Sequence, residues 1–139
     1  MQENNFTSSS TVYRDAEIIP TSERYSPLKP LSLYGATKLG AEALISGYCH
    51  TFDMHGIALR LANIVGAVNR HGVIYDFITK LFANPKELDV LGDGRQSKSY
   101  LYIDDCIDAL ILLLEKIEQV PFQIFNVDSI DSIKVSDIA

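Results

Sequence analysis

Short apolar runs alternate along this chain with stretches whose apolar residues recur at helical spacing. Residues 57–62 form a short and mostly apolar run, which is typical of a buried parallel strand. Residues 122–127 alternate apolar and polar side chains and predict a second strand. Between them, a helical pattern runs from Ser32, the expected N-cap, to about Phe52, and Gly56 is the expected stop.

The other segments continue this alternation, which predicts an α/β fold on a parallel sheet. Both ends look cut, because little apolar sequence precedes Phe6 and the last helix has barely begun. We therefore expect a piece of a larger domain. The further expected elements are a strand end over 6–13 that runs into a loop, an irregular connection over 14–33, helices over 73–82 and 104–118, strands over 88–91 and 100–103, and a helix that begins at 134.

The composition narrows the class of protein without identifying it. Among 139 residues, 12 are basic and 18 acidic, and the net charge of −6 argues against a nucleic-acid-binding surface. The longest apolar run, 109–114, is far shorter than the roughly 20 residues of a membrane span, and the first residues do not resemble a signal peptide. Cys49 and Cys106 stand far apart, and no carboxylate or thiolate pattern organises the histidines around a metal. We expect a reduced, cytoplasmic protein without a metal site or membrane contact.

Tyr34 and Lys38 are the first candidate for chemistry. They are four residues apart on a predicted helix and so share one face. A phenol is a weak base at neutral pH, but a nearby ammonium favours the phenolate, which can take the proton of an alcohol during hydride transfer. When nothing else is present, a solvated contact on an exposed helix face is the better explanation of such a pair. The run of serines at 8–10 upstream favours the catalytic interpretation.

Five blocks, in this order and spacing, resemble the extended short-chain dehydrogenase/reductase family, the NAD-dependent epimerases and dehydratases. The resemblance is strongest to UDP-glucose 4-epimerases, the archaeal ones in particular, and it runs from Phe6 to about Val127. It implies a partial Rossmann-like parallel sheet with part of a small substrate-binding region. The blocks are FTSSSTVY at 6–13, PTSE at 20–23, YGATK at 34–38, LRLANIVG at 59–66 and LGDGRQSKSYLYIDD at 91–105.

The resemblance assigns catalytic roles to Ser9, Tyr34 and Lys38. Tyr34 would be the base, and Lys38 would tune it; both would also contact the NAD cofactor, Lys38 at the nicotinamide ribose. Ser9 would be the hydroxyl partner that holds the substrate. We interpret Ser8 and Ser10 as strand-end backbone caps.

The resemblance also implies contacts to a UDP-sugar substrate. Asn63 stands where the family has an amide that contacts the diphosphate, although a strand-end turn residue is an alternative interpretation. The backbone of the strand expected at 88–91, with Leu91 at its end, would lie along the edge of the uracil ring. Lys98 stands where the family usually has a phosphate-binding Arg; a solvated lysine before a strand is the alternative.

The residues after Ser9 bear on the type of reaction. Dehydratases of this family carry an Asp-Glu pair where this chain has Ser10 and Thr11, so simple oxidation and reduction at C4, a 4-epimerase reaction, is favoured. Arg14 departs from the family, which has Gly there and allows a tight turn at that position.

No Gly-x-x-Gly-x-x-Gly loop occurs in the sequence, so we expect the amino-terminal NAD-binding segment to be missing. Residues 1–66 would then be the last part of the Rossmann-like domain, and 67–139 a truncated substrate-binding region mixed with its final strands. Whether this chain acts as an enzyme alone stays open. The alternatives are an inactive remnant, a sugar-nucleotide-binding piece, or another NAD-dependent sugar reductase or epimerase. The expected partners are a second copy in a homodimer or the missing half.

Overall fold

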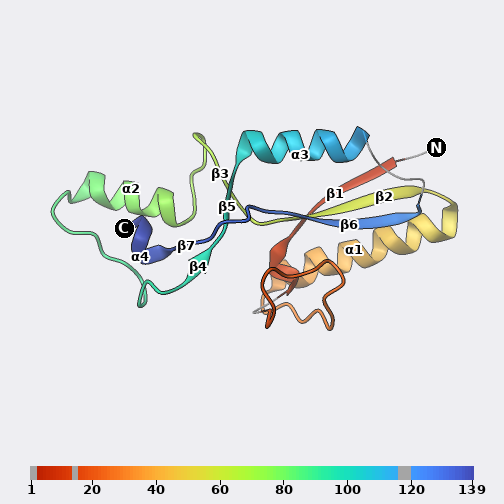
Figure 1. Ribbon diagram of the computed structural model, residues 1–139, viewed down its shortest axis with the longest axis horizontal. Helices are drawn as coiled ribbons and strands as arrows, with labels where there is room; N and C mark the ends of the chain where they lie inside the picture. The colour runs from red at the N-terminus through yellow and green to blue at the C-terminus, as the bar shows by residue number, and fades with distance from the viewer. Residues whose placement is uncertain (1–2, 14–15, 116–119) are drawn as a thin grey trace. The chain divides into compact units, whose positions relative to one another are not determined.

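The computed structural model describes residues 3–13, 16–115 and 120–139. The chain forms two compact units, the first built from residues 1–62 and 108–127 and the second from residues 63–107 and 128–139. Figure 1 labels the helices and strands along the chain.

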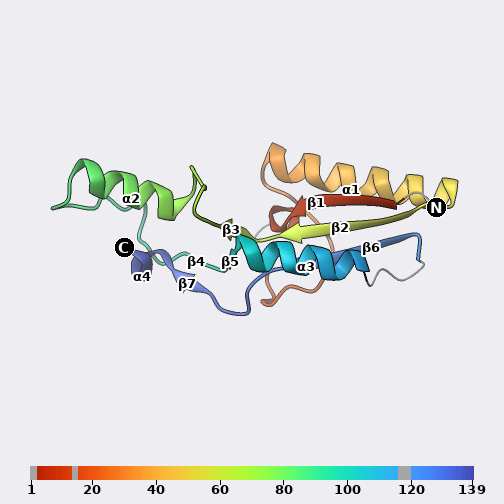
Figure 2. The ribbon, with the colours of Figure 1, turned by 90° about the horizontal axis from the view of Figure 1, so that it is seen from above.

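The first unit contains a parallel sheet with the strand order β1-β2-β6. The strands are β1 (Glu3–Ser9), β2 (His55–Leu61) and β6 (Phe122–Val127), and they lie side by side in Figures 1 and 2. In the central strand β2, Ile57, Ala58 and Leu59 are at most 2% exposed. This burial is expected for an apolar strand that has a neighbouring strand on each side. The strands predicted from 57–62 and 122–127 are confirmed.

The register of this sheet sets three polar residues in one row. Ser8 on β1 is the partner of Arg60 on β2, and Arg60 is the partner of Asn126 on β6. Aligned residues of parallel strands project to the same face, so these side chains can meet. The row lies near the carboxyl ends of the strands, the edge at which open α/β sheets bind ligands.

Helix α1 (Leu33–Phe52) packs against the sheet of the first unit. Ser32 is its N-cap, as predicted, and the Ser32 hydroxyl accepts a hydrogen bond from the Gly35 amide at 3.0 Å. The prediction that Gly56 stops the helix is wrong. Asp53 takes the left-handed conformation at φ 52° instead. Gly56 lies in β2, where a Cβ would come within 2.8 Å of the Cys49 sulfur, so its lack of a side chain permits close packing.

The first strand begins and ends earlier than predicted. β1 starts at Glu3, because the polar residues before Phe6 pair with β2, and it ends at Ser9. A 3₁₀ turn, η1 (Ser10–Tyr13), follows directly. Residues 16–32 contain no helix or strand, as expected for the connection. Arg14, where the sequence departs from the family, lies outside the described residues.

The second unit is built from short strand pairs. Its elements are β3 (Asn63–Val65), parallel to β5 (Tyr100–Tyr102); β4 (Ser97–Lys98), antiparallel to β7 (Ile133–Lys134); and the helices α2 (Val73–Ala83) and α4 (Val135–Ile138). The helix predicted at 73–82 and most of the strand at 100–103 are confirmed. β3, β4 and β7 were not predicted, since two or three residues carry too little periodicity.

The strand predicted at 88–91 is wrong. Residues 88–91 have no regular structure. The carbonyl of Asp89 accepts a hydrogen bond from the Lys80 ammonium at 2.8 Å, so a side chain of α2, rather than a neighbouring strand, bonds this backbone. Residues 88–91 have the apolar side chains of a short strand, but no other strand among the described residues pairs with them.

Helix α3 (Ile103–Glu115) begins one residue before the predicted start. The predicted end at 118 lies outside the described residues. Within the residues that the structure describes, no helix is both long and apolar enough to cross a membrane.

Candidate active site

Tyr34 and Lys38 lie on the first two turns of α1. The N-cap at Ser32 fixes where the helix begins and therefore which side chains face β1. The Lys38 ammonium donates a 2.7 Å hydrogen bond to the Thr7 carbonyl and lies 4.9 Å from the centre of the Phe6 ring. It also lies 5.6 Å from the centre of the Tyr34 ring. The structure thus brings Tyr34 and Lys38 together beside the end of β1.

Ser9 is the last residue of β1, two residues beyond the carbonyl that Lys38 binds. Its side chain is buried, and its hydroxyl oxygen accepts hydrogen bonds from the Thr11 amide at 3.3 Å and the Thr11 hydroxyl at 3.0 Å. These contacts fold the turn η1 back onto Ser9. Among the described residues, no hydrogen bond joins Ser9 directly to Tyr34 or Lys38.

The Lys38 ammonium and the Tyr34 phenol are both open to a ligand. Lys38 has three N–H donors, and the Thr7 carbonyl takes one of them. Tyr34 is 55% exposed, so its hydroxyl can reach a ligand from solvent. The two side chains lie on one face of α1.

Glu42 of α1 and Arg60 of β2 form a buried ion pair that was not predicted from the sequence. Glu42 and Arg60 are each about 2% exposed. The Arg60 Nε donates to Glu42 Oε1 at 3.0 Å, and Nη2 donates to Oε2 at 2.7 Å, a two-pronged contact. The Ser8 hydroxyl donates to the same carboxylate, so the interpretation of Ser8 as a backbone cap is wrong. The detectable signal was an Arg inside an apolar run, because a charge in a buried strand needs a partner.

Arg60 also binds the turn η1 and the connection 16–32. Its Nη1 donates to the Tyr13 hydroxyl at 2.8 Å and to the Glu23 carbonyl at 3.4 Å. Burial alone would lower the pKa of the Arg60 guanidinium, but hydrogen bonds to Glu42 and Tyr13 and the negative charge of Glu42 raise it above its ordinary value. The guanidinium therefore stays charged.

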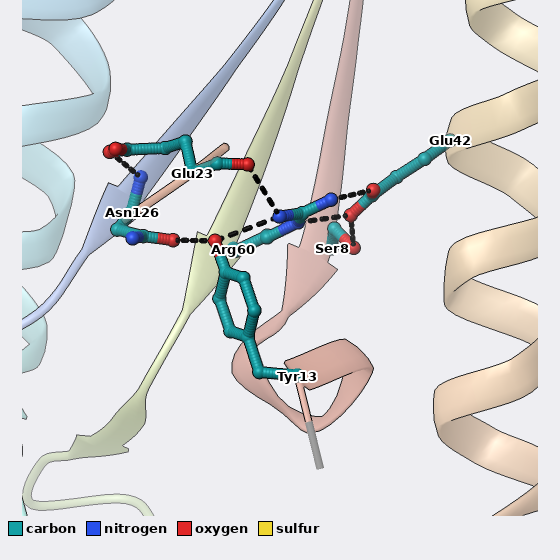
Figure 3. A network of polar contacts seen from close by, with 6 residues as sticks. All are labelled: Ser8, Tyr13, Glu23, Glu42, Arg60 and Asn126. Atoms are coloured by element: carbon teal, nitrogen blue, oxygen red, sulfur yellow. Dashed lines mark hydrogen bonds and ion pairs between the residues drawn. The ribbon is translucent and has the colours of Figure 1, made fainter. Parts of the chain in front are cut away.

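Asn126 completes the set of contacts. Its side-chain oxygen accepts from the Tyr13 hydroxyl at 2.6 Å, and its Nδ2 donates to the Thr21 carbonyl at 2.8 Å. Its backbone amide donates to the Glu23 carboxylate at 3.0 Å. Figure 3 shows these side chains converging from β1, β2, β6, α1, η1 and the connection. We call this set the Arg60 network: Ser8, Tyr13, Glu23, Glu42, Arg60 and Asn126.

The substrate candidates Asn63, Leu91 and Lys98 all belong to the second unit. Asn63 begins β3, and its Nδ2 donates to the Ser99 carbonyl at 2.9 Å, so it lies beside the residue after Lys98. Lys98 is exposed on β4. Leu91 is 80% exposed in the irregular segment before β4. Asn63 and Lys98 are thus brought near one another, whereas Leu91 sits on no strand.

A three-stranded parallel sheet with a serine at the end of one strand and a Tyr-x-x-x-Lys helix packed beside it belongs to the Rossmann-like class of α/β folds. The sequence model of the NAD dependent epimerase/dehydratase family matches residues 3–128, and the chain belongs to this family. The family and the α/β fold that we predicted are confirmed.

Solved and curated relatives agree with this membership. The crystal structure of a UDP-galactose 4-epimerase matches with a TM-score of 0.90 and 45% identity, over 98% of this chain and 45% of that one. A UDP-glucuronic acid 4-epimerase from Bacillus cereus, in complex with UDP-glucuronic acid and NAD, matches with a TM-score of 0.86 and 29% identity, over 98% of this chain and 43% of that one. The uncharacterized UDP-glucose epimerase YtcB of Bacillus subtilis is 35% identical over 111 residues, 80% of this chain and 34% of its own length. The chain spans less than half the length of each.

Proposed function

We propose that this chain supplies the catalytic residues of a UDP-hexose 4-epimerase that oxidises and re-reduces the sugar at C4. The observation that carries the proposal is the position of the Lys38 ammonium, bound to the Thr7 carbonyl near Ser9 and held against the Tyr34 ring. The family membership and the 45% identity to a UDP-galactose 4-epimerase support the same reaction.

In this mechanism Tyr34 takes the proton of the C4 hydroxyl, with the Lys38 ammonium beside it on the same face of α1. The Ser9 hydroxyl donates a hydrogen bond to the sugar oxygen and keeps the sugar in place. Bound NAD would supply the acceptor for the C4 hydride, which would return to the opposite face of the carbon and so invert its configuration. Tyr34 then gives the proton back to the sugar oxygen, which leaves the enzyme unchanged.

The residues present fit the nicotinamide end of NAD. Lys38 keeps two N–H donors beyond its bond to Thr7, and these suit ribose hydroxyls. Exposed Tyr34 stands one turn away on the same face. The 139 residues contain no glycine-rich loop, so we propose that another segment holds the cofactor's pyrophosphate.

The turn after Ser9 supports epimerisation over dehydration. Dehydration needs an acid that protonates a leaving hydroxyl, and η1 contains Ser10 and Thr11 in place of acidic residues. The Thr11 hydroxyl donates a hydrogen bond to the Ser9 hydroxyl oxygen, so Thr11 would orient the catalytic hydroxyl.

We assign the second unit to the nucleotide part of the substrate. Asn63 and Lys98 would contact the diphosphate, and Leu91 the uracil. In the same proposal, residues 1–66 complete the Rossmann-like domain and 67–139 form the substrate-binding region.

A second candidate function is a sugar-nucleotide-binding piece without catalysis. The absence of a glycine-rich loop from these 139 residues favours it. Conversion separates the two once an NAD-binding segment is supplied, since the enzyme would then turn UDP-galactose into UDP-glucose, whereas a binding piece would hold the sugar nucleotide unchanged.

The activity is tested directly by supplying a cofactor segment. These 139 residues would be joined to the NAD-binding segment of the UDP-galactose 4-epimerase with 45% identity. We expect this joined protein to convert UDP-galactose to UDP-glucose. A joined protein that binds NAD and UDP-galactose without conversion would refute the proposal.

The exposed side of α1 supports a homodimer. Leu44, Tyr48 and Phe52 are 67%, 58% and 61% exposed at a spacing of four, and the Tyr48 and Phe52 rings stack at 5.5 Å. In sedimentation, we expect a dimer for the chain and a monomer for Tyr48→Arg. The matched substitution Tyr75→Arg on α2 should leave the dimer intact.

A further inference from the structure

Arg60 touches every part of the first unit that frames the proposed catalytic residues. It is buried in the central strand and donates four hydrogen bonds to described residues. We infer that Arg60 is a positioning residue, which fixes the turn after Ser9 and the connection 16–32 relative to the helix that carries Tyr34 and Lys38. Its effect on catalysis rests on the proposed function, whereas its effect on the connection does not.

The first contact controls the helix. Tyr34, Lys38 and Glu42 are spaced by four residues and so form one stripe along α1. Two Arg60 nitrogens bind the two Glu42 oxygens, a geometry that resists rotation of the helix about its axis. The same carboxylate accepts from Ser8, the neighbour of Ser9, so strand end and helix share one anchor.

The second contact controls the turn after Ser9. Tyr13 ends η1, its hydroxyl accepts from Arg60, and its ring centre lies 4.7 Å from the Arg60 Cζ. At the other end of the turn, Thr11 donates to Ser9. The turn is therefore held at both ends, one of them by Arg60.

The third contact controls the connection. Residues 16–32 lack regular structure, so side chains must satisfy much of their backbone. Asn126 binds the Thr21 carbonyl and the Glu23 carboxylate, while Arg60 reaches the Glu23 carbonyl. The Tyr13 hydroxyl links the two anchors, because it accepts from Arg60 and donates to Asn126.

Stability alone does not explain an arginine at this position. A well-packed apolar pair often stabilises a core as much as a buried ion pair does. An apolar pair cannot, however, bind a helix carboxylate, a turn hydroxyl and a loop carbonyl together. Lysine keeps the charge but lacks the planar fork that spans these partners.

The test removes one link and leaves the ion pair in place. Tyr13→Phe keeps the ring and deletes the hydroxyl between Arg60 and Asn126. Tyr25→Phe is the matched control, because the Tyr25 ring packs edge-on against Tyr13 at 6.2 Å. Amide hydrogen exchange is measured along the 139-residue chain. Within residues 16–32 the readout is the amides of Arg24 and Tyr25, which donate to the hydroxyl and the carbonyl of Ser22. We expect these amides to exchange about tenfold faster in Tyr13→Phe, with α1 and β2 unchanged, and no change in Tyr25→Phe.

Two results would overturn the inference. One is equal exchange of residues 16–32 in both variants, and the other is a uniform acceleration that includes α1 and β2, which indicates a merely structural role. The double substitution Glu42→Met with Arg60→Met checks the same point without leaving a lone buried charge. We expect a folded chain whose residues 16–32 are unprotected; retained protection would refute the role of Arg60.

A kinetic measurement separates this inference from the proposed function. In the joined protein, we expect Tyr13→Phe to lower kcat several-fold and leave KM for UDP-galactose unchanged, and unchanged kcat would contradict positioning. If the unsubstituted joined protein has no activity, the proposed function fails, and hydrogen exchange still decides whether Arg60 orders the connection.

Discussion

The two units of this chain are built in different ways. The first has a three-stranded parallel sheet, with seven-residue strands β1 and β2, a 20-residue helix and a buried ion pair. The second has strand pairs of two or three residues. The proposed catalytic residues all lie in the first unit, and the proposed nucleotide contacts in the second. Atoms that react must be held more closely than atoms that bind a flexible diphosphate.

Loss of the base should have the largest effect. In the joined protein, Tyr34→Phe should lower kcat by about 10²–10⁴-fold, because the phenol that takes the C4 proton is gone. Lys98→Ala in the second unit should mainly raise KM. Steady-state kinetics with UDP-galactose measure both. A large KM effect for Tyr34→Phe with normal kcat would reverse the roles of the two units.

Ion pairs in the two units should differ in their contribution to stability. Arg60→Ala leaves the buried Glu42 charge without a partner and should lower the free energy of unfolding by about 3–5 kcal/mol. Asp76→Ala breaks a partly exposed pair with Lys80 at 3.0 Å but keeps the bond from Lys80 to the Asp89 carbonyl, and it should cost about 0.5 kcal/mol or less. Urea denaturation measures both values. Similar losses would show that the two units are equally dependent on their ion pairs.

One buried cysteine in each unit reports local opening. Burial raises the pKa of the Cys49 and Cys106 thiols above their ordinary 9.0, so both should react slowly at pH 8. We expect Cys106 to be alkylated faster than Cys49, since the second unit has less packed structure to protect it. Mass spectrometry of one sample compares the two sites. Faster labelling of Cys49 would contradict the difference in packing.

The smallest effect concerns a hydroxyl in the second unit. The Tyr100 hydroxyl is buried and has no hydrogen-bond partner among the described residues. Tyr100→Phe should therefore stabilise the chain by about 1 kcal/mol, while Tyr102→Phe on the same strand should change little. Thermal or urea unfolding measures this difference, and a destabilised Tyr100→Phe would indicate a missing partner for the hydroxyl.

The same hydroxyl gives a pH dependence. Burial raises the Tyr100 pKa above its ordinary 10.0, so the unfolded chain loses this proton first as the pH rises. The contribution is complete below pH 10 and is lost as the pH rises through the folded-state pKa. The fall in stability above pH 10 should be smaller in Tyr100→Phe than in the unsubstituted chain.

The sequence predicted the first unit better than the second, for physical reasons. Residues 57–62 and 33–52 carry periodicity long enough to identify a strand and a helix, and Ser32 has the side chain of an N-cap. Residues 88–91 are mostly apolar as well, but they have no partner strand among the described residues and form none. Pairing between β4 and β7 depends on residues more than 30 positions apart, which local patterns do not record.

The candidate site was predicted in part. Tyr34 and Lys38 follow from helical spacing, and the structure brings them together. The Arg60 network could not be assembled from the sequence, because its members come from six segments, of which the register of the sheet aligns only three. A buried-strand arginine signals that a partner exists but does not identify it.

The proposed reaction at C4 is tested most directly by following the hydrogen on that carbon. The joined protein would be given UDP-galactose with deuterium at C4, and the UDP-glucose product would be examined by mass spectrometry and NMR. Transient oxidation with return of the same hydride predicts that the deuterium remains at C4. Product in which the deuterium has exchanged with solvent would contradict the account.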